Sequence, residues 1–183
     1  MLNRLFGLVL LIGLSPLFII VGLFILAEDG FPVFFKQKRV GVHYTFFEIY
    51  KFRSMRKDTP NVATHLLGNP EQYLLKIGGL IRKLSLDELP NLINIIKGEM
   101  VFVGPRPALY NQDDLMALRV EKGVSQLIPG ITGWAQVNGR DELSLEEKVQ
   151  YEKEYLDRKS FGFDLKIIVM TFTKVLATQG VSH

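Results

Sequence analysis

The chain has 183 residues, enough for one hydrophobic core of ordinary size, so a second catalytic domain is not expected. Because the sequence contains no cysteine, disulfides, thiolate metal sites and cysteine nucleophiles are all excluded. The net charge of +3 is small but unevenly distributed, and the hydrophobic content of 48% is concentrated at the N-terminus.

The N-terminal segment has the composition of a membrane anchor. Residues 5–27 carry no charged side chain, and as a helix such a stretch can cross about 30 Å of hydrocarbon. It is too long for the apolar core of a signal peptide, and residues 25–27 do not form a small-x-small cleavage site. We therefore expect a membrane anchor over residues 1–29 and one globular domain over residues 30–183.

A Ser15-Pro16 step interrupts the anchor. Pro16 removes a backbone hydrogen bond and clashes with the preceding turn, so the helix should bend there, and the Ser15 hydroxyl can bond a carbonyl that the break frees. The two halves could enter and leave the bilayer on one face, or a kinked helix could still cross it. Re-entry keeps Arg4 and the terminal amine on the side of the basic residues that follow, so charge placement favours re-entry.

Basic residues dominate residues 30–57, the segment after the anchor, which contains one acidic residue, Glu48. They are Lys36, Lys38, Arg39, Lys51, Arg53, Arg56 and Lys57. Such a block beside an apolar anchor indicates a cytoplasmic location, facing anionic lipid headgroups or a phosphorylated substrate. The alternative is a solvated strand pair with ordinary lysines. Residues 31–40 and 45–55 are rich in aromatic and β-branched side chains around Gly41 and predict a short hairpin.

Two helices are predicted next. Asn69-Pro70 is a helix start and predicts a helix to Leu84, weakened at Gly78-Gly79. A second helix begins near Asp87 and stops at Lys97-Gly98.

The rest of the chain alternates strand and helix signals, giving an α+β fold class. Residues 101–103 form a strand candidate, and Ser144 with Glu147 has the capping-box pattern that begins a helix to about Asp157. The last helix is expected from Asp164. Its apolar residues cover more than one face, so it is either deeply buried or interfacial.

Asp87 and Glu88 are the strongest candidates for chemistry. Ser85 with Glu88 fits a capping box, which would make these acids purely structural. That helix start would place Pro90 where it breaks an intrahelical bond, whereas a start at Asp87 puts Pro90 in the tolerated first turn. Asp87 would then lie at a helix N-terminus, where the pKa of a carboxyl is lowered, and could be a nucleophile or a magnesium ligand.

Arginines on tight turns are candidate phosphate ligands. Arg106 lies between two prolines and is pre-positioned for bidentate contact, although a surface salt bridge would explain it too. Arg140 lies on an Asn-Gly-Arg turn, and Arg82 precedes the acid pair. The three histidines have no metal-ligand spacing, and no helix carries the basic face of a nucleic-acid binder, so nucleic acid is not an expected partner.

Four motifs closely resemble the bacterial sugar transferase family, the monotopic polyprenyl-phosphate phosphoglycosyltransferases. They are Ser-Leu-Asp-Glu-Leu-Pro at 85–90, Val-Gly-Pro-Arg-Pro at 103–107, the run at 129–140, and Lys-Phe-Arg-Ser-Met at 51–55. The Ser15-Pro16 anchor matches as well. The chain resembles the minimal form of the family, with the catalytic core alone.

The resemblance implies transfer of a phospho-sugar from a UDP-sugar to polyprenyl phosphate, with UMP released, as the first membrane step of a bacterial glycan pathway. It implies that Asp87 carries the phospho-sugar covalently. It also implies that Mg²⁺ is the cofactor, with Asp87 and Glu88 as its candidate ligands. Glu88 would assist the reaction through the metal or through the incoming phosphate. The candidate phosphate-binding residues are Arg53, Arg82, Arg106 and Arg140.

The resemblance also implies a re-entrant anchor in the bacterial inner membrane, with the catalytic domain on the cytoplasmic face. A homodimer is left open. One departure is that Gly7 stands where the family commonly has an aspartate, which puts the interfacial contact of that acid in doubt. Two other functions remain open at this point: a magnesium-dependent hydrolase of lipid phosphates or nucleotide sugars, and a non-catalytic membrane adaptor.

Overall fold

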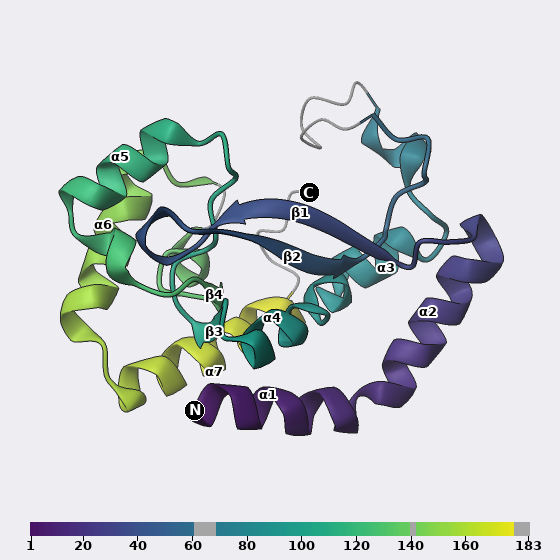
Figure 1. The fold of residues 1–183 in the computed structure, drawn as a ribbon, viewed down its shortest axis with the longest axis horizontal. Coiled ribbons are helices and arrows are strands. Elements are labelled where there is room, and N and C mark those ends of the chain that lie inside the picture. Colours follow the sequence, from purple (N-terminus) through teal and green to yellow (C-terminus); the bar gives the residue numbers. More distant parts are fainter. Residues whose placement is uncertain (61–68, 140–141, 178–183) are drawn as a thin grey trace.

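The computed structural model describes residues 1–60, 69–139 and 142–177. Helices dominate it, together with two small two-stranded sheets, so the expected mixture of α and β elements is confirmed. In Figure 1 the β1–β2 hairpin runs across the middle of the molecule, α1 and α7 lie below it, and α2 rises along the right side.

The predicted break in the N-terminal segment is present. The helices α1 (Leu2–Gly13) and α2 (Ser15–Asp29) meet at 61°. Pro16 lies in the first turn of α2, where its missing N–H leaves no bond unmade, and the Ser15 hydroxyl donates to the Ile12 carbonyl over 2.7 Å. No single helix in the described ranges is long and apolar enough to cross a bilayer, but the bent pair meets that test by length and composition.

The N-terminal helices share their inner faces with the rest of the fold. Val21 and Ile25 of α2 are buried in a cluster with Phe52, Leu75 and Ile81. On α1, Leu10 and Leu11 pack with α4, and Gly7 is buried against Ile95. An aspartate at position 7 would therefore meet an apolar contact in this chain.

The predicted hairpin is confirmed. Strands β1 (Phe34–Val40) and β2 (Phe46–Phe52) pair antiparallel, with Phe34 opposite Phe52 and Val40 opposite Phe46. The short 3₁₀ turn η1 (Val42–Tyr44) joins them.

The single helix predicted from Asn69 to Leu84 is wrong. The chain forms a 3₁₀ turn, η3 (Pro70–Tyr73), then an extended segment, then α3 (Gly78–Lys83). The extended segment pairs with the end of the hairpin, since Leu75 N–H donates to the Ser54 carbonyl over 3.0 Å. Burial of Leu75 and this long-range pairing outweigh local helix propensity.

The next helix begins later than predicted. Ser85 adopts a left-handed conformation (φ 54°) and makes no side-chain cap, so the capping-box alternative is absent. Asp87 and Glu88 lie on a separate 3₁₀ turn, η4 (Leu86–Glu88), and α4 (Asn91–Lys97) starts after Pro90. The predicted stop is confirmed, because Gly98 ends the helix with a φ of 87°.

The C-terminal half packs helices against a parallel strand pair, β3 (Val101–Val103) and β4 (Gly130–Thr132). The helices are α5 (Asp113–Glu121), α6 (Leu145–Arg158) and α7 (Phe161–Ala177). Two further 3₁₀ turns, η5 (Val124–Gln126) and η6 (Gln136–Asn138), flank β4. The capping box predicted for the start of α6 is formed.

The helix α7 begins about one turn before the predicted Asp164 and has two different faces. Phe163 and Ile167 are buried in the main core. Phe161, Leu165, Val169 and Phe172 on the same helix are exposed. Of the two alternatives drawn from the sequence, the interfacial one fits this division better.

Candidate active site

The acid pair lies on the η4 turn between α3 and α4. The left-handed Ser85 redirects the chain out of α3, and its carbonyl accepts the Glu88 N–H over 3.2 Å. Leu89 N–H donates to the Leu86 carbonyl over 3.1 Å, which closes the turn. Asp87 and Glu88 are thus presented by a tight, hydrogen-bonded turn rather than by a helix N-terminus.

Glu88 joins two segments that are distant in sequence. Its Oε1 accepts Lys51 Nζ from β2 over 2.7 Å and Arg106 Nη2 over 3.2 Å. The side chains of Glu88 and Lys51 are only 14% and 17% exposed, so this pair is screened less than a surface ion pair. The arrangement fixes the acid beside two cations.

Burial raises the pKa of the Asp87 carboxyl, with Lys51 opposing the shift and the negative charge of Glu88 adding to it. Arg82 and Arg106 oppose the rise as well. The expectation of a lowered pKa at a helix N-terminus is therefore wrong, because α4 starts after Pro90 and Asp87 is largely removed from water.

Arg82 approaches the acid pair from the last turn of α3. Its Nε donates to Ser54 Oγ over 2.8 Å, which orients the guanidinium. Burial lowers the pKa of Arg82, and the charge of Asp87 opposes that shift. Arg82 and Asp87 are thus close enough to interact electrostatically.

Arg106 lies on the turn after β3, between the buried Pro105 and Pro107. A buried ion pair between α5 and α6 holds this turn. Arg119 Nε donates to Glu152 Oε2 over 2.8 Å. Arg119 Nη2 also donates to the Arg106 carbonyl over 2.9 Å. The side chains of this pair are 6% and 2% exposed. The position of Arg106 therefore depends on α5 and α6, which sequence reasoning did not connect to the site.

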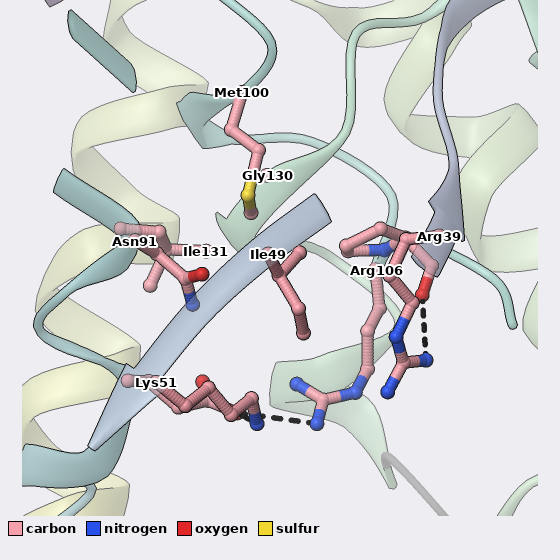
Figure 2. Close-up of a pocket in the computed structure, with 10 residues that line it drawn as sticks. Arg39, Ile49, Lys51, Asn91, Met100, Arg106, Gly130 and Ile131 are labelled. Carbon is pink, nitrogen blue, oxygen red and sulfur yellow. Dashed lines mark hydrogen bonds and ion pairs between the residues drawn. The ribbon is translucent and has the colours of Figure 1, made fainter. Parts of the chain in front are cut away.

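Arg39, near the end of β1, lies beside Arg106, although the sequence did not assign it to the site. It donates to the Pro107 carbonyl over 3.1 Å and to the side chain of Gln37. Burial, followed by the charge of Arg106, lowers the pKa of Arg39 to about 10. In Figure 2 the Arg106 guanidinium lies between Arg39 and Lys51. The one feature of the sequence that could have indicated Arg39 is its place in the basic segment of residues 30–57.

The other predicted arginines are placed differently. Arg53 is buried and forms an ion pair with Asp29, and it also donates to the carbonyls of Gly30 (2.6 Å) and Pro32 (2.7 Å). These bonds tie the end of α2 to β2, so Arg53 positions the N-terminal helices in this structure and not the acid pair. Arg140 lies outside the described residues.

The carboxylates of Asp87 and Glu88 suit Mg²⁺ only if phosphate oxygens of the substrate complete its coordination. Within residues 1–60, 69–139 and 142–177 no cluster of three or more acidic or histidine side chains could hold a metal ion. Asp87 and Glu88 offer one or two carboxylates, and Mg²⁺ is commonly bound by that number together with substrate phosphates and water. The acids therefore fit a metal that arrives with a diphosphate.

Two adjoining cavities flank the arginines. The smaller one is lined by Lys51, Glu88, Asn91 and Met100 among others, and Figure 2 shows its walls. The larger one, of about 210 Å³, extends towards η6 and α6. Arg39, Arg106 and Pro107 line both cavities, so the smaller cavity, which Glu88 lines, and the larger one meet at these two arginines.

The chain is similar to known sugar transferases over nearly its whole length. A family model described as bacterial sugar transferase matches residues 1–178. The chain is 45% identical over 188 residues to a Bacillus subtilis protein named uncharacterized sugar transferase EpsL, covering 100% of this chain and 91% of that protein.

Two further relatives have more specific names. Proteins of Xanthomonas campestris and Escherichia coli, both named UDP-glucose:undecaprenyl-phosphate glucose-1-phosphate transferase, are each 35% identical, over 185 and 173 residues. They cover 97% and 90% of this chain, which spans only 38% and 37% of their own lengths.

Proposed function

This chain belongs to the bacterial sugar transferase family and is an enzyme that transfers sugar phosphates, and from that premise we propose that it moves a phospho-sugar from a UDP-sugar to polyprenyl phosphate and releases UMP. The observation that carries the proposal is the charge arrangement around the acid pair. Arg39, Lys51 and Arg106 interact with Glu88, and Arg82 interacts with Asp87. Four cations around two carboxylates leave an excess of positive charge that suits a diphosphate.

The proposed reaction has two steps. The Asp87 carboxylate attacks the phosphorus next to the sugar, the bond between that phosphorus and the bridging oxygen breaks, and UMP leaves with the bridging oxygen. A phosphate oxygen of the lipid then attacks the same phosphorus, and the aspartyl oxygen leaves as carboxylate. Because Asp87 is poorly solvated, its ionised form is more basic and more nucleophilic than that of an exposed aspartate.

The remaining residues supply electrostatic stabilisation. Phosphoryl transfer depends mainly on positioning and charge neutralisation. Arg106 and Arg82 would contact the transferring phosphate and Lys51 would hold Glu88. Mg²⁺, bound by Asp87 or Glu88 and by substrate oxygens, would add neutralising charge.

We further propose that residues 1–29 form a re-entrant anchor in the bacterial inner membrane and that residues 30–183 form the catalytic domain on its cytoplasmic face. Apolar side chains are exposed on the outer faces of α1 and α2 as well as on α7. On the N-terminal helices they are Leu5, Val9, Ile12, Ile19, Leu23 and Phe24. Exposed apolar surface of this extent indicates contact with lipid.

Topology can be tested directly because the chain has no cysteine. Single cysteines at Asn3→Cys and Phe31→Cys, on either side of the helix pair, should react equally with a thiol reagent that cannot cross the membrane of sealed vesicles. Opposite accessibility would contradict re-entry.

Activity is tested by product analysis. The protein in detergent with Mg²⁺ and UDP-sugar labelled in the sugar should release UMP and place the label in the lipid fraction only when polyprenyl phosphate is present. Asp87→Asn should abolish transfer, whereas Asp114→Asn, an exposed acid in the first turn of α5, should not. UMP release without label in the lipid fraction would support a hydrolase instead.

A further inference from the structure

The larger cavity contains an amide group that the fold leaves unpaired. Both polar atoms of the Gln136 side chain, Oε1 and Nε2, are buried and have no hydrogen-bond partner within the part of the chain that the structure describes. Buried polar groups in native proteins are nearly always paired, so each exception calls for an explanation. A missing ligand is one explanation that can be tested.

The position of Gln136 is fixed by its surroundings. It begins the η6 turn, in which Val137 N–H donates to the Gly133 carbonyl over 3.1 Å and Asn138 Nδ2 donates to the Trp134 carbonyl over 2.7 Å. Gln136 Oε1 lies so near Gly133 that a Cβ there would be only 2.7 Å away. The glycine therefore makes room for the carboxamide.

The cavity has the composition of a site for a planar ring attached to a phosphate. Arg39 and Arg106 line both this cavity and the smaller one, which Glu88 lines as well. Apolar side chains supply part of the lining; they are Pro107, Ala108, Leu109, Leu115 and Ala135. The polar residues Gln112, Arg119, Lys148 and Glu152 complete it with Gln136. Its volume of about 210 Å³ would hold several waters at the roughly 30 Å³ that each occupies in the liquid, and it has room for a pyrimidine.

We propose that this cavity binds the uracil of the nucleotide sugar and that the Gln136 carboxamide pairs with the imide edge of the base. Nε2 donates to a ring carbonyl, and Oε1 accepts the N3–H of the base. A carboxamide offers a donor and an acceptor side by side, which is the pairing that glutamine makes with nucleobase edges elsewhere. This inference rests on the proposed function, because it takes the donor to be a uridine diphosphate sugar.

The geometry gives the two halves of the donor separate places. The phosphate next to the sugar must reach Asp87, so the leaving nucleotide extends away from the acid pair, past Arg106. Arg106 and Arg39 line the larger cavity as well as the smaller one, whereas Glu88 lines the smaller one alone. The base therefore occupies the cavity, and the transferred sugar stays outside it.

The test measures binding of UMP and 3-methyluridine monophosphate by calorimetry, with the full chain in detergent. The wild type should bind UMP roughly tenfold or more tightly than the methylated analogue, which has lost the N3–H. Gln136→Leu should weaken UMP binding by about the same factor and abolish the preference. Ribose 5-phosphate, which has no base, should bind equally to both proteins.

Gln150→Leu, the same substitution on an exposed position of α6, is the matched control and should behave as wild type. If Gln136→Leu does not fold, Gln136→Met keeps the length of the side chain, replaces the carboxamide by a thioether, and should also lose the preference. The inference is overturned if a folded variant retains the preference, or if it changes only the KM for polyprenyl phosphate and leaves the KM for the UDP-sugar unchanged. A wild type that binds UMP but transfers no sugar would instead count against the proposed function.

Discussion

Removing the carboxylate of Glu152 should damage both stability and activity, because this acid is the buried partner of Arg119. With both side chains almost fully buried, Glu152→Ala leaves a guanidinium desolvated and unpaired. Breaking a buried pair in this way costs about 3–5 kcal/mol. At roughly 2–4 °C per kcal/mol for a chain of this size, the melting temperature should fall by roughly 6–20 °C.

The same ion pair holds the Arg106 carbonyl, so its effect on catalysis can be separated from its effect on stability. In the double variant Arg119→Met/Glu152→Leu, apolar side chains replace both charges, which is often neutral or stabilising. Stability should recover, but kcat/KM for the UDP-sugar should stay low because the Arg106 turn has lost its donor.

Thermal unfolding in detergent and initial rates of UMP release are the assays. Asp157→Ala, which removes an exposed pair with Lys153 on the same helix, is the control and should cost only about 0.3–0.5 kcal/mol. If Glu152→Ala costs no more than this control, the buried pair does not stabilise the fold as described. If the double variant recovers full activity, the pair does not position Arg106.

Four further variants test the start of α3, the acid pair and the Arg106 turn. Gly78→Ala would place a Cβ 2.1 Å from the Ser54 carbonyl and should lower the melting temperature, whereas Gly79→Ala, with nothing within 4 Å, should raise it slightly. Asp87→Asn should be more stable than wild type at neutral pH in denaturation curves. Because the pKa of Asp87 is raised in the folded state, its ionisation destabilises the folded protein above that pKa. The difference in stability between the two proteins should vanish as the pH falls below the unfolded-state pKa of 3.8. Arg106→Lys keeps the charge but loses the guanidinium fork, so kcat/KM for the UDP-sugar should fall by roughly tenfold or more, and an unchanged value would remove Arg106 from phosphate binding.

Features governed by neighbouring residues could be predicted from the sequence. The bend at Ser15-Pro16, the end of α4 at Gly98 and the capping box at Ser144 all depend on chemistry within one helical turn. The β1–β2 hairpin belongs with them, because composition and a turn residue define it.

Errors arose where distant segments decide the local conformation. Leu75 is extended because it pairs with Ser54 and is buried, and neither fact is visible in residues 69–84. Asp87 was expected at a helix N-terminus, but the left-handed Ser85 separates its turn from α4. The direction of the Asp87 pKa shift was wrong for the same reason, since burial depends on the assembled fold.

The candidate site was predicted in part. Motifs indicated Asp87, Glu88, Arg82 and Arg106, and the structure brings these together. The supporting residues were missed, because a buried Arg119–Glu152 pair and an unpaired amide at Gln136 are recognisable only once α5, α6 and η6 are packed.

Intact-protein mass spectrometry can detect a phospho-sugar carried covalently by Asp87. The full chain is mixed with UDP-sugar and Mg²⁺ without lipid acceptor and quenched in acid. The wild type should gain the mass of one phospho-sugar, peptide mapping should place it on Asp87, and Asp87→Asn should gain nothing. If the enzyme transfers sugar but never shows this mass, or shows it on another residue, Asp87 is not the residue that carries the phospho-sugar.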